Sequence, residues 1–142
     1  MGNFRFLEHG ADVAFEARGE SLEELFRQAA RAMYASMLNL ERVSPRESRT
    51  VRVEAPDLVI LLHDWLSELL FITDTEGLVF SDFDVKISQN RDGEYLLEAT
   101  AHGEPVDPER HEAVTEIKAV TYHGMEVYEE GGEWVARVIL DV

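Results

Sequence analysis

The sequence predicts an α+β fold, a two-layer sandwich in which one mixed, mostly antiparallel sheet carries two helices on one face. Two segments place apolar residues at helical spacing, whereas most of the remaining chain alternates polar and apolar residues as strands do. The predicted order is two strands, a helix, a strand, a helix and then a run of strands, which is typical of the α+β class. The length of 142 residues predicts a single domain over residues 1–142.

The first half of the chain carries the two helix signals. Ser21-Leu22-Glu23-Glu24 is a capping box, so a helix is expected from there to about Leu38. Asp57 follows Pro56 and can cap a second helix, whose wide apolar face through Leu70 is typical of a helix laid on a sheet. Alternating segments predict strands at residues 4–8, 11–17 and 49–55.

The second half reads as strands. Residues 78–88 and 94–102 are two strand candidates joined by Asn-Arg-Asp-Gly, which is a strong hairpin signal. After a loop, a strand is expected at 116–123, with Gly124 bending the chain before 125–129 continue it. The Gly131-Gly132 pair turns the chain into a last strand that runs to Val142.

Composition excludes several kinds of site. The chain has no cysteine, which excludes disulfides and thiolate chemistry, and it has neither a long apolar run nor a signal peptide, so we expect a cytoplasmic protein. Its net charge of −16 argues against direct nucleic-acid binding and favours a basic protein partner or a cation. An equally open explanation is that the acidity only maintains solubility.

Two aspartates near the ends of predicted strands form the main candidate site. Asp12 lies near the start of the strand 11–17, and Asp141 lies one residue before the end of the last strand. If these strands are neighbours, Asp12, Asp141 and the α-carboxylate of Val142 meet. Such oxygen ligands suit Ca²⁺, Mg²⁺ or Mn²⁺. The alternative is two unrelated acidic residues in an acidic protein.

Other polar residues give weaker signals. The five histidines, which have no zinc-type spacing, are His9, His63, His102, His111 and His123. His9 precedes Asp12 by three residues and can border the cluster. Lys118 lies in an apolar strand candidate, where it either pairs with the carboxylates or extends from an edge to water. No phosphate-binding loop, dinucleotide motif or nucleophile motif is present, so the sequence supplies no covalent nucleophile.

Four segments resemble the archease family, the small activator proteins of RtcB-type RNA ligases. They are HGADVAFEARGESLEELFRQAARAM, LLHDWLSELLFITDTEG, GEPVDPERHEAVTEIKAVTYHGMEV and WVARVILDV. EIKAVTYH and ILDV are the most specific. The family usually has His-Thr-Ala-Asp where this chain has His9-Gly10-Ala11-Asp12, a change that removes a hydroxyl but no metal ligand.

The resemblance implies a function and a site. Archeases bind a divalent ion through positions that correspond to Asp12, Asp141 and Val142. They are not enzymes themselves but non-catalytic cofactor proteins of the RNA ligase. They promote guanylylation and multiple turnover of the RtcB-type ligase in tRNA splicing, and they extend its nucleotide use from GTP to ATP, dGTP and ITP. The polar residues around the metal correspond to His9, Lys118 and His123. The alternatives are a chaperone for tRNA-modifying enzymes such as methyltransferases, and a metal-dependent hydrolase.

Overall fold

A computed structural model describes residues 2–142, and it confirms the α+β class. Within that range it has two α-helices, a short 3₁₀ helix and eight strands. In chain order these are β1 (Asn3–Leu7), β2 (Val13–Gly19), α1 (Leu22–Met37), η1 (Leu40–Arg42), β3 (Glu47–Ala55), α2 (Leu58–Glu76), β4 (Leu78–Gln89), β5 (Tyr95–Pro105), β6 (Ala119–Val120), β7 (Glu126–Glu130) and β8 (Glu133–Asp141). None of the described helices is long and apolar enough to span a bilayer.

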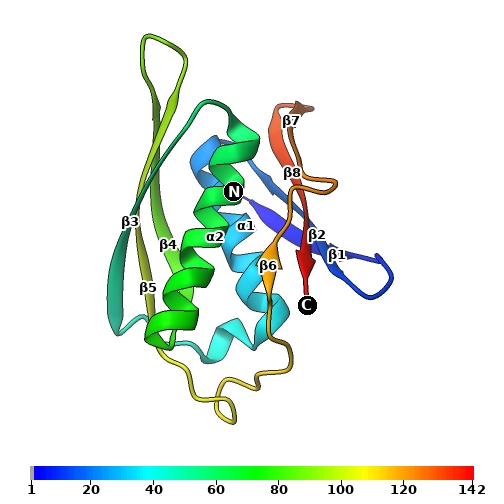
Figure 1. Ribbon diagram of the computed structural model, residues 1–142, viewed down its shortest axis with the longest axis vertical. Coiled ribbons are helices and arrows are strands. Elements are labelled where there is room, and N and C mark those ends of the chain that lie inside the picture. The colour runs from blue at the N-terminus through cyan, green and yellow to red at the C-terminus, as the bar shows by residue number, and fades with distance from the viewer. Residues whose placement is uncertain (1) are drawn as a thin grey trace.

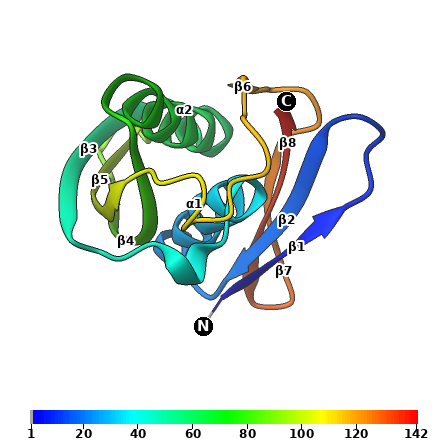
Figure 2. The same ribbon diagram turned by 90° about the horizontal axis from the view of Figure 1, so that it is seen from below.

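The strands form two sheets, so the expectation of one mixed sheet with both helices on one face is wrong. The first sheet has the strand order β1-β2-β8-β6, with β7 also paired to β8, and the second has the order β3-β5-β4. Every pairing is antiparallel. The two helices lie between the sheets, and α1 contacts both β2 and β4 (Figure 1 and Figure 2).

The helix surfaces explain why two sheets are needed. Nine of the 16 residues of α1 are buried, including Leu25 and Tyr34 on different sides of the helix. The apolar face of α2 is also wide and includes Leu61, Trp65 and Leu70. A helix that is apolar over much of its circumference must be covered from more than one side. A single sheet leaves part of each face in water, whereas two sheets cover it.

The predicted helix starts are confirmed by their caps. The Ser21 Oγ accepts a hydrogen bond from the Glu24 amide at 3.1 Å, and Asp57 Oδ1 accepts one from the Ile60 amide at 2.9 Å. At the other end of α2, Gly77 has a φ of 69°, a left-handed conformation that glycine adopts without strain. These local signals set the positions of both helices between the sheets.

The predicted strand at 116–123 is wrong except for the two residues of β6. Lys118 precedes β6, and a loop over residues 121–125 separates β6 from β7, although both strands pair with β8. Gly124 in this loop has a φ of 68°, and a Cβ there would lie only 2.8 Å from Ile139 Cδ1. The left-handed φ favours glycine at this position. The loop interrupts what would otherwise be one continuous strand beside β8.

Candidate metal site at the ends of β2 and β8

Two aspartates lie at the same end of the β2–β8 pair. Val13, the first residue of β2, is paired with Leu140 of β8. Asp12 lies in the bend directly before Val13, and Asp141 directly follows Leu140 at the end of β8. Figure 2 shows the C-terminal end of β8 between β6 and the turn that joins β1 to β2. The fold thus brings the two predicted side-chain ligands to one end of the first sheet.

Val142 and Lys118 also lie at this end of the first sheet. Val142 directly follows Asp141 and packs partly against the core. The Lys118 amide donates to the Asp141 carbonyl at 2.8 Å, and Ala119 is paired with Asp141. The Lys118 side chain is exposed, and its ammonium lies beyond 4.0 Å from every carboxylate of the described residues. The structure therefore holds Lys118 beside the site through its backbone and not through an ion pair.

The two aspartates carry little compensating charge from the chain. His9 Nδ1 lies 3.6 Å from Asp12 Oδ2, and the Asp12 amide donates to the His9 carbonyl at 3.1 Å. The side chain of Asp12 is 43% exposed. Asp141 is also exposed, and within residues 2–142 no cationic side chain forms an ion pair with it. Exposed carboxylates with so little positive charge beside them attract a cation.

The donor set fits a hard divalent cation. Asp12, Asp141 and the terminal carboxylate of Val142 offer only oxygen atoms, which are the ligands that Ca²⁺, Mg²⁺ and Mn²⁺ prefer. Among the described residues, no three side chains of His, Asp or Glu gather closely enough to hold a metal ion by themselves. The two aspartates would therefore need a further ligand, and the predicted one is the α-carboxylate of Val142.

The remaining histidines have different positions. His123 is exposed in the loop between β6 and β7. His63 Nε2 is 3.1 Å from the Val120 carbonyl, and the His63 ring stacks on Tyr122 with a 3.8 Å centroid distance. This side chain therefore connects α2 to β6. His102 belongs to β5 of the second sheet and does not reach this end of the molecule.

A buried carboxylate at the end of β5 was not predicted from the sequence. Glu104 is 1% exposed at its side chain. It accepts hydrogen bonds of 2.8–3.1 Å from the Ser44 amide, the Arg46 and Arg110 guanidinium groups and His111 Nε2. Hydrogen bonds from Arg110 and the Ser44 amide hold the pKa of Glu104 far below its ordinary value. No local sequence signal marks this role, because two of the partners, Ser44 and Arg46, lie in a distant segment of the chain.

His111 links this carboxylate to the loop that leads to Lys118. The Asp107 amide donates to His111 Nδ1 at 2.9 Å, so the ring hydrogen lies on Nε2 and is donated to Glu104. The buried ring therefore closes the loop between β5 and β6 onto Glu104. This cluster of Glu104, Arg46, Arg110 and His111 is called the Glu104 cluster below.

A second buried carboxylate, Glu16, lies on the outer face of the first sheet. It is 2% exposed and accepts bonds from the Nε atoms of Arg5, Arg18 and Arg137 at 3.1–3.3 Å. Burial alone raises the pKa of Glu16, but hydrogen bonds from Arg5 and Arg18 outweigh it and hold that pKa below its ordinary value. Arg5 and Arg137 are the cross-strand neighbours of Glu16, so strand register creates this cluster.

The whole chain matches a known family. The model of the Archease protein family (MTH1598/TM1083) matches residues 4–142. This chain belongs to the archease family. It is 44% identical over 143 residues to the protein archease of Pyrococcus abyssi (strain GE5 / Orsay), a match that covers 100% of both chains. It is 48% identical over 142 residues to that of Methanothermobacter thermautotrophicus, again with 100% of both chains covered.

Two solved structures share the archease fold. The solution structure of Methanobacterium thermoautotrophicum protein 1598 matches with a TM-score of 0.86 and 47% identity, covering 98% of each chain. The crystal structure of an archease described as a possible chaperone, from Thermotoga maritima, matches with a TM-score of 0.63 and 22% identity, covering 96% of this chain and 94% of the other. The two-sheet α+β arrangement is therefore the archease fold.

Proposed function

We propose that this chain activates an RtcB-type RNA ligase in tRNA splicing by promoting guanylylation and multiple turnover of the ligase. In this proposal Asp12, Asp141 and the terminal carboxylate of Val142 hold a divalent ion, such as calcium, magnesium or manganese. The proposal also includes the extension of nucleotide use from GTP to ATP, dGTP and ITP. Membership of the archease family supports it, together with the absence of any nucleophile motif in the sequence.

The positions of Asp12 and Asp141 at one end of the β2–β8 pair carry the proposal. Their carboxylates are exposed at the end of adjacent strands, where the chain supplies little positive charge to offset them. A divalent ion bound there would supply a positive charge that attracts phosphate oxygens. His9 lies against Asp12 and would hold the orientation of that carboxylate. Lys118, whose ammonium is free of carboxylates in the described chain, would contact a phosphate or an acidic group of the ligase.

The acidic surface suits a ligase as partner. A net charge of −16 repels RNA, so the chain would not compete with the ligase for its substrate. A protein that binds RNA must present basic surface, and opposite charges on two proteins raise their association rate. The proposed partner contact is therefore between proteins, with no direct binding of nucleic acid by this chain.

Ligation at high substrate excess tests the proposal. The cognate ligase would receive GTP, Mn²⁺ and a large excess of RNA ends, with and without this protein. We expect product well beyond one turnover per ligase only when the protein is present. Asp12→Asn and Asp141→Asn should each lower that stimulation by about tenfold or more, the usual cost of disturbing a metal site. Asp92→Asn, in the β4–β5 hairpin, is the matched control and should stimulate fully.

Two results would contradict the proposal. Unchanged ligation in the presence of the wild-type protein would reject the activator function. Full stimulation by both aspartate variants would keep the activator function and reject the metal site. Extension of the chain by one residue after Val142 moves the terminal carboxylate, so it should reduce stimulation as the aspartate variants do.

The description of the Thermotoga maritima relative as a possible chaperone favours a second candidate. In that case the chain would keep a tRNA-modifying enzyme, such as a methyltransferase, from aggregating. The charge of −16 would keep such a complex soluble. Light scattering of a heated methyltransferase tests this: protection that Asp12→Asn leaves unchanged would favour the chaperone function over metal-dependent activation.

A further inference from the structure

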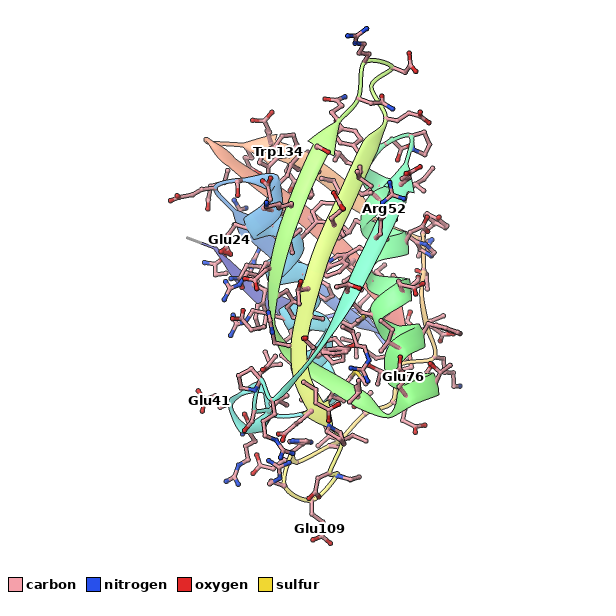
Figure 3. All side chains as sticks on the ribbon, turned by 90° about the vertical axis from the view of Figure 1, so that its left-hand side faces the viewer. Glu24, Glu41, Arg52, Glu76, Glu109 and Trp134 are labelled. Carbon is pink, nitrogen blue, oxygen red and sulfur yellow. The ribbon has the colours of Figure 1, made fainter. Side chains whose placement is uncertain are left out.

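A groove lies between β3 and α2, away from the metal site. It has a volume of about 440 Å³ and is lined by Arg52, Val53, Glu54, Asp64, Ser67, Glu68 and Phe71. Figure 3 shows β3, which carries the labelled Arg52, as the outermost strand of the second sheet on the side of α2. The groove thus has one wall made by a strand edge and one made by a helix.

The edge of β3 that faces the groove has free backbone groups. In the strand order β3-β5-β4, β3 pairs with β5 only. Every second residue of an edge strand turns its N–H and C=O away from the sheet, and these groups can pair with another chain. Within residues 2–142, no other segment donates a backbone hydrogen bond to β3 or accepts one from it. With nine residues, β3 is long enough to pair with an added strand.

Phe71 supplies an apolar contact on the helix side. Its side chain is 60% exposed, although the rest of the apolar surface of α2 is largely buried. A large aromatic ring that lines a groove offers an anchoring contact for an apolar side chain. The free edge and the exposed ring therefore lie on opposite walls of the same groove.

The charge of the groove selects the kind of segment. Three carboxylates and one guanidinium line it, and Arg52 is already paired with Glu54 at 2.9 Å. Asp64 accepts from His63 at 3.0 Å, whereas Glu68 has no partner among the described residues. The remaining charge is negative, which favours lysine and arginine side chains. The net charge of −16 disfavours a second copy of this chain.

We propose that this groove binds an extended, basic segment of a partner protein, which adds to β3 as an antiparallel or parallel strand. The backbone of the segment pairs with the free edge of β3. Alternate side chains then point to the two sides of the added strand, so an apolar residue meets Phe71 and the basic residues face Asp64 and Glu68. This site is independent of the metal site, and its occupancy does not require a divalent ion.

A synthetic peptide tests the site directly. The probe is acetyl-Lys-Val-Lys-Val-Lys-Val-amide, labelled for fluorescence anisotropy, with amide chemical shifts and hydrogen exchange followed on ¹⁵N-labelled protein. We expect saturable binding, shifts concentrated in β3 and α2, and slower exchange of β3 amides. A peptide with proline in place of the central valine should bind about tenfold more weakly because proline lacks the N–H that strand pairing needs.

Matched variants distinguish the groove from general attraction to an acidic protein. Phe71→Ala and Glu68→Lys should each weaken binding by about tenfold, since each removes one contact of the groove. The controls Phe6→Ala and Glu129→Lys change an exposed ring and an exposed carboxylate on the first sheet, and both should bind as the wild type does.

Three results would overturn the proposal. Equal binding of the proline peptide would show attraction without strand pairing. Equal loss of binding in Glu68→Lys and Glu129→Lys would show a general charge effect. A protein that sediments as a dimer, with β3 amides already protected without peptide, would show that a second copy occupies the groove.

Discussion

The carboxylate of the Glu104 cluster and the carboxylates of Asp12 and Asp141 have opposite environments. Glu104 is buried and receives hydrogen bonds from two guanidinium groups, an imidazole and a backbone amide. Asp12 and Asp141 are exposed, and in the described chain only His9 lies within ion-pair distance of either carboxylate. The chain thus compensates the negative charge of Glu104 with its own side chains, whereas it leaves the charges of the two aspartates largely uncompensated.

The difference distinguishes a carboxylate that stabilises the fold from one that is available for binding. A buried charge must be compensated within the protein, because desolvation is otherwise too costly. An exposed pair of carboxylates without a cationic partner costs the fold little free energy while water surrounds it. Binding of a cation to such a pair stabilises the folded state. The same isosteric change from carboxylate to amide should therefore have different effects in the two regions.

The largest effect on stability is expected for Glu104→Gln. The side-chain amide nitrogen of the new glutamine would replace one carboxylate oxygen and face an N–H donor, either that of Arg46 or those of Arg110 and His111. At least one buried hydrogen bond is therefore lost, and the guanidinium groups of Arg46 and Arg110 lose the negative charge that compensates them. We expect the free energy of unfolding to fall by about 3 kcal/mol, as for other broken buried pairs. Denaturant unfolding measures it. Glu109→Gln is the control, since Figure 3 shows Glu109 extending outward from the same loop.

The pH dependence of unfolding in acid tests whether the stability lost in Glu104→Gln comes from the negative charge of Glu104. The pKa of Glu104 is lowered in the fold, so below pH 4.5 the unfolded chain binds a proton that the folded chain does not. The stabilisation from Glu104 is therefore complete above that pH and is lost as the pH falls towards the folded-state pKa. Glu104→Gln should flatten the fall in stability below pH 4.5, and an unchanged slope would argue against a charged Glu104.

The sequence and the structure agree where the signal is local. The caps Ser21 and Asp57 predict both helices, and the alternation over residues 11–17 predicts β2, which begins two residues later, at Val13. That the last strand lies beside β2 was an assumption of the site prediction, and the register bears it out.

Features that depend on distant contacts could not be predicted. Glu104 meets Ser44 and Arg46 across 60 and 58 residues of chain, and no spacing rule links such positions. The division into two sheets depends on which strands cover which side of each helix, a choice that local patterns leave open. The predicted strand at 116–123 is reduced to the two residues of β6, and a loop that contains the left-handed Gly124 follows it, which a periodicity argument cannot detect.

Calcium should have the next largest effect, and only through the aspartate pair. A ligand that binds only the folded state at a concentration 100-fold above its dissociation constant stabilises it by about 2.7 kcal/mol. We therefore expect added Ca²⁺ to raise the melting temperature of the wild type by about 8 °C. Asp12→Asn should abolish this rise. Glu104→Gln should show the same rise, although its melting temperature without calcium is lower than that of the wild type. A rise of equal size in Asp12→Asn would place the ion elsewhere.

The smallest effect is expected for Asp141→Asn in the absence of divalent ions. Asp141 is exposed, so removing its charge lowers the negative charge at this end of the sheet and breaks no side-chain ion pair of the described chain. The backbone contacts of this residue with Lys118 and Ala119 remain, because they use main-chain atoms. We expect a melting temperature within about 1 °C of the wild type or slightly above it, measured in a chelating buffer. A marked loss of stability would mean that Asp141 is compensated as Glu104 is, and the two regions would then differ only in burial.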